Sequence, residues 1–316
     1  MASPTIAVVI PAYKVSSHIE GVIASIGKNV AYIIVVDDAC PEKSGEVAKK
    51  VKDPRVTVLF HDKNQGVGGA TVTGYKAALE TPADIVVKLD GDGQMDPGFI
   101  PQLIAPLEAN LADYSKGNRF SSVENLESMP FIRVIGNAGL SFMTKLSSGY
   151  WTVTDPTNGF TAIRREILQE LRFAKLHRRF FFESDMLFRL NLLGAAVADV
   201  PMKANYGTEK SNLSVLKSLF QFPWLHFVNH QKRIFYSYYL KEMSIASFEL
   251  PLGVGLLGFG TIFGINAWIS ASAAGQAATT GNVMIAALPI ILGFQLVLAF
   301  LSYDIAQTPK RPRHLR

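Results

Sequence analysis

Short apolar runs alternate with segments of helical pattern along the N-terminal part of the chain. These runs occupy Ile6–Ile10, Tyr32–Val36, Val56–Phe60 and Ile85–Leu89, and the first is continuously apolar, which is typical of a strand buried on both faces. Helices are predicted after each of them, at Ser16–Ile26, Ser44–Val51, Gly66–Glu80 and Pro97–Ala109. This alternation predicts an α/β domain with a Rossmann-like, mostly parallel sheet covered on both faces. Pro11 is expected to end the first strand.

A second pattern appears near the C-terminus, where no Asp, Glu, Lys or Arg occurs from Leu250 to Tyr303. A membrane span needs roughly 20 apolar residues. The segment therefore predicts two transmembrane helices, Leu250–Ala273 and Val283–Tyr303, joined by a small polar loop. The alternative is a buried core hairpin of a soluble protein. Small residues in the first span would allow close helix contacts: they are Gly253, Gly255, Gly258, Gly260 and Gly264.

Aromatic and basic residues are interleaved just before these spans. The mixture favours helices lying in the bilayer interface over an amphipathic helix packed on the domain. We therefore divide the chain into a domain at residues 1–210, interfacial amphipathic helices at 211–249, a transmembrane hairpin at 250–303 and a basic tail at 304–316. Cations flank the hairpin at both ends and are absent from its loop, which predicts a cytoplasmic domain and two cytoplasmic termini at the cytoplasmic (inner) membrane. The N-terminus lacks the basic region of a signal peptide.

The charge balance argues against nucleic acid as a partner. The net charge is +5, but the last seven residues alone hold four of the cations. The excess therefore lies largely in a tail and makes no basic face. The single cysteine, Cys40, excludes an intramolecular disulfide framework and a cysteine-based zinc site.

Pairs of acidic residues follow two of the predicted strands. Asp37 and Asp38 follow the second, and Asp90 and Asp92 follow the fourth. Ligands of open α/β sheets bind outside the carboxyl ends of the strands. Oxygen ligands suit a hard divalent cation. The pattern thus predicts a cation-assisted site at this edge, although a single acidic pair after a strand is usually a turn or a helix cap.

The ordered motifs of the chain resemble those of family 2 glycosyltransferases. They are PAY (Pro11–Tyr13), VVDDAC (Val35–Cys40), NQGVGGA (Asn64–Ala70), LDGDGQMDP (Leu89–Pro97), KGNRF (Lys116–Phe120), DPTNGF (Asp155–Phe160) and FFESDM (Phe181–Met186). With the two C-terminal spans, the chain is similar to polyprenyl-phosphate glycosyltransferases such as bactoprenol glucosyltransferases and dolichol-phosphate mannose synthases. The resemblance implies a GT-A fold, an Mg²⁺ or Mn²⁺ cofactor, a nucleotide-sugar donor and a polyprenyl phosphate acceptor.

The resemblance also implies roles for individual donor-site residues. Asp92 and Gln94 would hold the metal, which neutralises the departing diphosphate. Residues expected to contact the nucleotide sugar are Pro11, Ala12, Tyr13, Asp37, Asp38, Gly68, Gly69 and Asp90. The two glycines would let the backbone approach the nucleotide sugar closely, and their alternative is a plain helix start.

Acceptor and catalytic residues follow from the same resemblance. Arg119, Arg133 and Lys210 match cations that bind phosphates in the family, whereas Ala204 stands where the mannose synthases have an arginine. Asp92, Asp155, Glu183 and Asp185 are the candidate catalytic residues. Because a phosphate acceptor is already anionic, we expect Glu183 and Asp185 to contact the sugar or the metal site, or to orient the acceptor. Asp155 would contact the sugar, or else cap a turn.

The sequence therefore predicts inverting transfer of one glucose-like sugar to polyprenyl phosphate, with UDP favoured over GDP as the donor nucleotide. Two other hypotheses stay open. A processive polysaccharide synthase would carry a QxxRW motif and more spans, and the nearest string here is HQKRIF (His230–Phe235). A non-catalytic nucleotide-sugar-binding membrane partner would lack turnover. A homo-oligomer, as a tetramer, is a further hypothesis.

Overall fold

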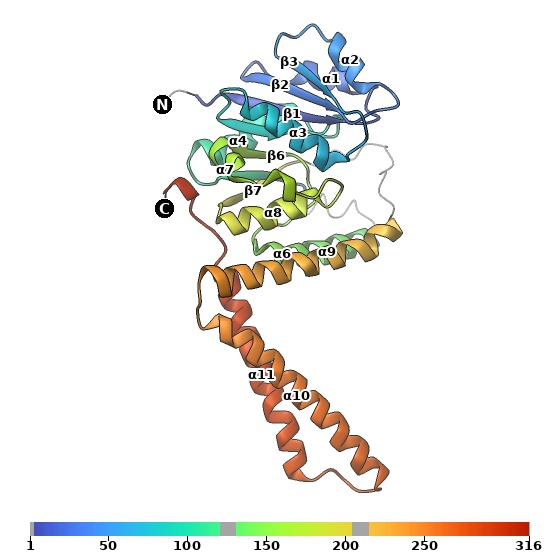
Figure 1. Cartoon of the computed structure of the whole chain (residues 1–316), viewed down its shortest axis with the longest axis vertical. Coiled ribbons are helices and arrows are strands. Elements are labelled where there is room, and N and C mark those ends of the chain that lie inside the picture. The colour runs from blue at the N-terminus through green and yellow to red at the C-terminus, as the bar shows by residue number, and fades with distance from the viewer. Residues whose placement is uncertain (1–2, 121–130, 204–214, 316) are drawn as a thin grey trace. The chain divides into compact units, whose positions relative to one another are not determined.

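The structure is a computed structural model, and it divides into two compact units. It describes residues 3–120, 131–203 and 215–315, with the side chains of 131–135 and 215–220 left out. The first unit comprises Met1–His230 with Pro309–Arg316, and the second comprises Gln231–Thr308. Figure 1 traces the elements of both.

A seven-stranded mixed sheet forms the centre of the first unit, in the order β3-β2-β1-β4-β6-β5-β7. Every strand runs in the same direction except β6, which is antiparallel to β4 and β5. The mostly parallel sheet predicted from the apolar runs is therefore confirmed. The strands are β1 (Ile6–Ala12), β2 (Val30–Asp37), β3 (Val56–Phe60), β4 (Ile85–Lys88), β5 (Tyr114–Asn118), β6 (Thr161–Arg164) and β7 (Val197–Pro201).

The first strand does not end at Pro11, as the sequence suggested, but continues to Ala12. Pairing of β1 with β4 stops at Val9 and Lys88, whereas pairing with β2 continues to Ala12 and Asp37. Pro11 has the same strand parity as Val9, so its missing N–H would face the β4 side, where no strand partner remains. The proline consequently costs the sheet no ladder hydrogen bond.

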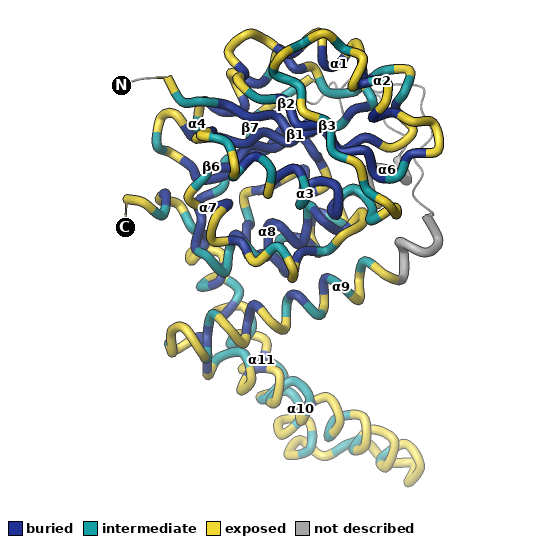
Figure 2. Tube along the Cα trace, turned by 45° about the horizontal axis from the view of Figure 1, so that its top comes forward, coloured by how far each residue is buried: buried dark blue, intermediate teal, exposed yellow. Residues whose placement is uncertain are grey.

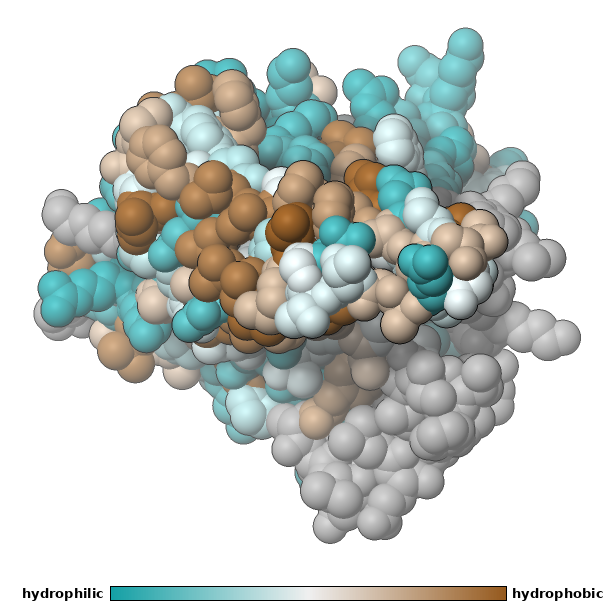
Figure 3. Space-filling model, turned by 90° about the horizontal axis from the view of Figure 1, so that it is seen from below, coloured by the Kyte–Doolittle hydropathy of each residue, from teal (hydrophilic) through white to brown (hydrophobic). Residues whose placement is uncertain are grey.

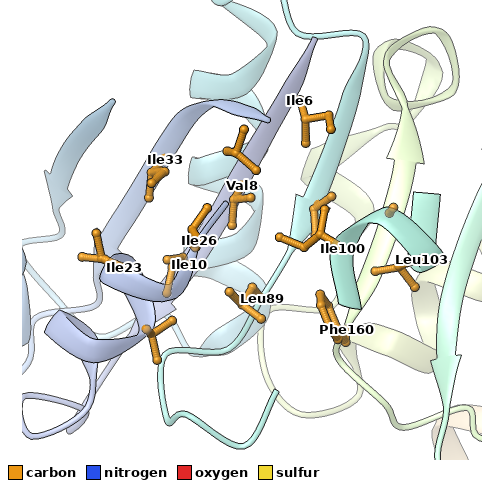
Figure 4. Close-up of a cluster of buried hydrophobic side chains, with 14 of the residues drawn as sticks. Ile6, Val8, Ile10, Ile23, Ile26, Ile33, Leu89, Ile100, Leu103 and Phe160 are labelled. Carbon is orange, nitrogen blue, oxygen red and sulfur yellow. The ribbon is translucent and has the colours of Figure 1, made fainter. Parts of the chain in front are cut away.

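Helices cover both faces of the sheet. Alternate residues of β1 point to opposite sides, so that Ile6, Val8 and Ile10 pack with α1 and α4, as Figure 4 shows. Ala7 and Val9 belong to a second cluster on the other face, which includes residues of α3, α7 and α8. In Figure 2 the inner strands are accordingly mostly dark blue, whereas the edge strands β3 and β7 are intermediate or exposed. The helices of this unit are α1 (Ile19–Ser25), α2 (Ser44–Lys50), α3 (Val67–Leu79), α4 (Ile100–Glu108), α6 (Phe131–Ser148), α7 (Arg165–Glu170), α8 (Phe182–Leu193) and most of α9 (Val215–Phe235).

Two predicted helices begin later than expected. The first begins at Ile19 and not at Ser16. The helix predicted at Pro97 opens as a 3₁₀ turn, Pro97–Phe99, and becomes α-helical at Ile100. Asp96 caps this turn, because its Oδ1 accepts a hydrogen bond of 2.8 Å from the Gly98 amide.

The second unit contains two long apolar helices, α10 (Ala246–Ala273) and α11 (Thr280–Ala306), preceded by a π-helical turn at Tyr236–Lys241. Both helices are long and apolar enough to cross a membrane, and most of their side chains are exposed. Hydrophobic residues gather on the face seen in Figure 3, which includes these helices. The first span begins four residues before the predicted Leu250, because Ala246–Glu249 continue its first turn.

Close packing holds the two apolar helices together. A Cβ added at Gly260 would lie 2.6 Å from the carbonyl oxygen of Ala286, and one at Gly293 would lie 2.7 Å from that of Gly253. A buried ion pair closes the base of the hairpin, where Arg233 Nη1 lies 2.6 Å from Asp304 Oδ1. The hydroxyl of Tyr238 donates to the same carboxylate over 2.6 Å.

The basic C-terminal residues pack on the first unit. The Arg313 amide donates to Asp113 Oδ2 over 2.9 Å, and its guanidinium donates to the Leu193 carbonyl over 2.6 Å and lies 2.8 Å from Glu170 Oε2. The chain therefore returns, after both apolar helices, to the unit that precedes them.

Candidate active site

The predicted donor residues gather at the carboxyl ends of β1, β2 and β4. Asp38 follows β2, and its amide donates over 3.1 Å to the carbonyl of Ala12 at the end of β1. Pro11 and Ala12 are buried there, whereas Tyr13 is 39% exposed and faces solvent. Because β4 is the other neighbour of β1, Asp90 and Asp92 leave the sheet at the same edge.

The two acids after β2 hold the surrounding loops. Asp37 accepts from the amides of Cys40 and Gly45, over 2.7 and 2.6 Å. Asp38 accepts from the amides of Gln65 and Gly66, over 2.8 and 2.7 Å. Both carboxylates are buried. Asp37 is thus occupied with the turn before α2, while Asp38 fixes the NQG loop against the end of β2.

One residue of this region was not singled out by the sequence. The Nδ1 atom of His61 lies 2.7 Å from Asp38 Oδ1, and its Nε2 lies 2.8 Å from Thr73 Oγ1. The imidazole therefore links the acid after β2 to helix α3. The spacing of His61 from other histidines does not suggest a metal site. Only its contacts in the folded structure identify its linking role.

A buried lysine joins three of the predicted motifs. Lys88 is 1% exposed, and its Nζ lies 2.7 Å from Asp90 Oδ1 and 3.3 Å from Glu183 Oε1. It also donates to the Gly159 carbonyl over 3.3 Å. Burial disfavours the charged ammonium, but the carboxylates of Asp90 and Glu183 outweigh this and raise the pKa of Lys88 above its ordinary value.

Gly159 leaves room for this cluster. A Cβ there would lie 2.5 Å from Lys88 Nζ and 2.7 Å from Asp90 Oδ2. The LDGD, NGF and FFESD motifs thus meet around one ammonium group. The one sequence feature that could have pointed to this cluster is the lysine within the apolar run IVVKL.

The predicted metal ligands lie on one turn after β4. The backbone amide of Gln94 donates to Asp92 Oδ1 over 3.0 Å, and this bond fixes the Asp92 carboxylate on the turn. Among the described residues, no group of three His, Cys, Asp or Glu side chains could hold a metal ion by itself. Mg²⁺ in proteins commonly combines one or two carboxylates with waters and substrate phosphates.

Asp155 does not reach toward a sugar in this structure. Its side chain is fully buried and accepts two hydrogen bonds from the Arg119 guanidinium, from Nε over 2.7 Å and from Nη2 over 3.0 Å. Burial would raise the pKa of Asp155, but hydrogen bonds and charge from Arg119 outweigh it and lower this pKa. Asp155 thus holds Arg119, the predicted phosphate-binding arginine, and its expected contact with the sugar stays a prediction.

A second buried lysine contacts the turn that carries Asp155. Lys116 donates to the carbonyls of Asp155 and Asn158, the latter over 3.1 Å. Burial lowers the pKa of Lys116 to about 8, against the opposing charges of Asp155 and Asp199. The lysine therefore holds the DPTN turn through backbone carbonyls.

Asp185 is also a structural residue. It is 3% exposed, and its oxygens accept from the His177 amide over 2.9 Å, from Arg189 Nε over 2.9 Å and from Asn229 Nδ2 over 3.2 Å. These contacts join α8 to the preceding loop and to α9. The expected role of Asp185 at the sugar, the metal site or the acceptor stays a prediction, whereas Glu183, on the same first turn, reaches the Lys88 cluster.

The glycines at the start of α3 lie close against other protein atoms, and their expected contact with a nucleotide sugar stays a prediction. A Cβ at Gly68 would lie 2.3 Å from the His177 carbonyl oxygen, and one at Gly69 would lie 2.5 Å from Gln65 Cβ. The Gly69 amide donates to the Arg178 carbonyl over 2.9 Å. Two predicted acceptor residues cannot be placed: the side chain of Arg133, on α6, and the whole of Lys210 lie outside the described residues.

Known proteins are similar to this chain in sequence and in fold. The UDP-N-acetylglucosamine–dolichyl-phosphate N-acetylglucosaminyltransferase of Methanococcus voltae is 32% identical over 221 residues, covering 65% of this chain and 88% of that protein. The undecaprenyl-phosphate mannosyltransferase of Micrococcus luteus is 30% identical over 173 residues, covering 54% and 70%. The glucosyl-3-phosphoglycerate synthase of Mycobacterium tuberculosis, crystallised with Mn²⁺, UDP and its product, aligns with a TM-score of 0.55 at 22% identity, covering 73% and 80%.

The first unit accordingly has the GT-A fold expected from the motifs. The family described as "Glycosyl transferase family 2" matches residues 7–172, which include the whole cluster around Lys88 except Glu183. The match spans more than half of the chain, and the chain covers most of the length of its Methanococcus relative. On these grounds the protein belongs to glycosyl transferase family 2 and is a glycosyltransferase.

Proposed function

We propose that this protein transfers one sugar from a UDP-sugar to polyprenyl phosphate at the cytoplasmic face of a membrane, with inversion at the anomeric carbon. The names of its relatives support this acceptor, because they act on dolichyl or undecaprenyl phosphate. UDP is supported by the donor named for the Methanococcus protein and by the nucleotide bound to the structural neighbour. The proposed sugar is glucose-like, and N-acetylglucosamine and mannose are the alternatives that the relatives' names supply.

The observation that carries the proposal is the pairing of the candidate base residues. Glu183 pairs with Lys88, Asp185 with Arg189, and Asp155 with Arg119. A hydroxyl acceptor needs a general base, and a carboxylate held by a cation is a poor one. A phosphate acceptor carries negative charge at neutral pH and needs only to be positioned. The site therefore suits an acceptor that arrives already ionised.

The chemistry then requires one displacement. A phosphate oxygen attacks the anomeric carbon, the bond from that carbon to the nucleoside diphosphate breaks, and UDP leaves with the bonding electron pair. Lys88 holds Asp90 and Glu183 beside the donor, while Asp155 orients Arg119 toward a phosphate. An α-linked donor would give a β-linked product.

The donor set around Asp92 fits a hard divalent cation. Asp92 and Gln94 would hold Mg²⁺ or Mn²⁺ through oxygen atoms, and the metal would supply neutralisation of charge on the departing diphosphate. The remaining ligands would come from the donor.

Three features support a membrane location. The helices α10 and α11 are long enough to span a bilayer. Two exposed aromatic residues of α9, Trp224 and Phe227, stack at 5.8 Å between ring centroids, as suits an interfacial helix. The docking of Arg313 on the first unit supports two spans that leave both termini on one side. A homotetramer remains part of the proposal.

The deciding experiment uses purified full-length protein, undecaprenyl phosphate and a panel of UDP- and GDP-sugars, with lipid products identified by mass spectrometry. We expect one sugar per lipid phosphate, and loss of product with EDTA or in Asp92→Asn. Asp53→Asn is the matched control, because Asp53 precedes β3 at the opposite edge of the sheet and pairs with Arg55. Polymeric product would favour a processive synthase, and nucleotide-sugar binding without product would favour a non-catalytic partner.

A further inference from the structure

A solvent-accessible pocket lies beside the start of α3. Its volume is about 600 Å³, and it is lined by Asp62, Lys63, Asn64, Gln65, Arg178 and Arg179. The first four residues belong to the loop after β3, and the two arginines belong to the segment before α8. None of these six was assigned a role by the motifs.

The pocket is positively charged. Lys63, Arg178 and Arg179 face a single carboxylate, that of Asp62. Within the described part of the chain neither arginine pairs with a carboxylate, and Arg178 Nη1 instead lies 3.4 Å from Gln65 Oε1. Two guanidinium groups beside an ammonium group attract a doubly charged anion, and guanidinium geometry matches phosphate oxygens.

The backbone that carries the arginines is fixed on helix α3. The Arg178 carbonyl accepts from the Gly69 amide over 2.9 Å. Gly66 has φ +86°, and a Cβ there would lie 2.7 Å from that carbonyl oxygen and 2.9 Å from Arg179 Cγ. The glycine-rich start of α3 thus allows the arginine segment to approach closely.

Two residues of the candidate active site are connected to the segments that line the pocket. Asp38 holds the amides of Gln65 and Gly66 from the β2 side. Glu183, which lies 3.3 Å from Lys88 Nζ, is four residues beyond Arg179. The loops that line the pocket are therefore connected to the predicted donor site on both sides.

We infer that this pocket binds a phosphate group of a substrate through Arg178, Arg179 and Lys63. The inference rests on the proposed function for the identity of the substrate, since both the UDP-sugar and the lipid acceptor carry phosphate. Its three cations would act in addition to Arg119, which Asp155 holds in the candidate active site.

The test compares Arg178→Gln with Arg179→Gln and with the double variant in the full-length protein. Binding of UDP and of farnesyl phosphate is measured at equilibrium, and KM is measured for the UDP-sugar and for undecaprenyl phosphate. We expect the double variant to weaken one of the two probes at least tenfold and to raise the matching KM. Weaker UDP binding identifies the donor diphosphate, and weaker farnesyl phosphate binding identifies the lipid phosphate.

Two further variants separate binding from folding. Arg172→Gln removes an exposed arginine of the same segment that does not line the pocket, and it should change neither affinity. Asp62→Asn removes the opposing charge and should tighten the same probe a few-fold, which a merely structural role would not do. Unchanged affinities in the double variant, or wild-type protein that binds neither probe, would overturn the inference. Intact probe binding without sugar transfer would defeat only the proposed function.

Discussion

Lys88 and Glu183 lie 3.3 Å apart, Nζ to Oε1, although they are 95 positions apart in the sequence. Lys88 ends β4 and Glu183 begins α8, so this contact ties the sheet to the helix at the candidate active site. The same ammonium lies 2.7 Å from Asp90 Oδ1. One buried positive charge therefore balances two carboxylates beside the donor residues.

Replacing this lysine should damage both stability and turnover. Lys88→Met keeps the side-chain length but leaves Asp90 and Glu183 facing each other without a cation. Removing one partner of a buried ion pair costs about 3–5 kcal/mol, and we expect the lower end because Asp90 is 30% exposed. We also expect kcat to fall at least tenfold, measured with saturating substrates. Lys76→Met, on the exposed side of α3, is the control; equal effects of the two variants would contradict the role of Lys88.

Periodicity predicted the part of the fold that depends on local pattern. Runs such as Ile6–Ile10 identify β1 to β4 because buried parallel strands are continuously apolar. The antiparallel insertion of β6 between β4 and β5 follows from tertiary pairing that no single run encodes. The acidic pairs after β2 and β4 leave the sheet at the same edge, and that this edge binds the donor stays a prediction.

The hydrogen-bond partners of the candidate catalytic acids could not be predicted from the sequence. Asp155 and Asp185 have the same residue type and motif context as catalytic acids, but Arg119 and Asn229 occupy their oxygens. These partners lie 36 and 44 residues away in the chain, so only the folded structure identifies them. Lys88 was missed for the opposite reason, because a lysine inside an apolar run looks like a strand residue.

Helix α3 should not tolerate a side chain at Gly68. In Gly68→Ala the new Cβ would meet the His177 carbonyl oxygen at 2.3 Å and Phe182 Cδ2 at 2.8 Å. Overpacking of this kind costs about 1–3 kcal/mol. Denaturant unfolding should show this loss for Gly68→Ala. Gly139→Ala is the matched control on α6, where nothing lies within 4 Å, and it should gain about 0.5–1 kcal/mol. A neutral Gly68→Ala would contradict the close packing.

Mild acid should destabilise the contact of α9 with α6. His226 is 3% exposed, its Nδ1 lies 2.8 Å from Ser147 Oγ, and the Phe181 ring packs on it at 4.8 Å between centroids. Burial lowers the pKa of His226 from 6.5 to about 4. Between these values the unfolded state binds a proton that the folded state does not, so stability falls as the pH drops through this window.

The measurement for His226 is the apparent melting temperature at pH 7.5 and at pH 5. The decrease should be smaller in His226→Leu than in the wild type, because leucine cannot take up a proton. The Ser147 hydroxyl keeps a partner in that variant, since it also donates to the Thr144 carbonyl over 3.2 Å. Identical decreases in the two proteins would exclude His226 as the source.

The glycines of α10 should divide into two classes by the helix face on which they lie. A Cβ at Gly260 would lie 2.6 Å from the Ala286 carbonyl oxygen and 2.8 Å from Ile290 Cγ1, whereas one at Gly258 would meet nothing within 4 Å. Gly260→Ala should therefore force α10 and α11 apart at a cost of about 1–3 kcal/mol. Gly258→Ala should leave the hairpin unchanged, as measured by the melting temperature in detergent. If Gly258→Ala instead lowers the mass of the assembly without changing that temperature, the open face of α10 contacts another copy of the chain. Equal melting temperatures for both variants would show that the hairpin does not depend on close approach at Gly260.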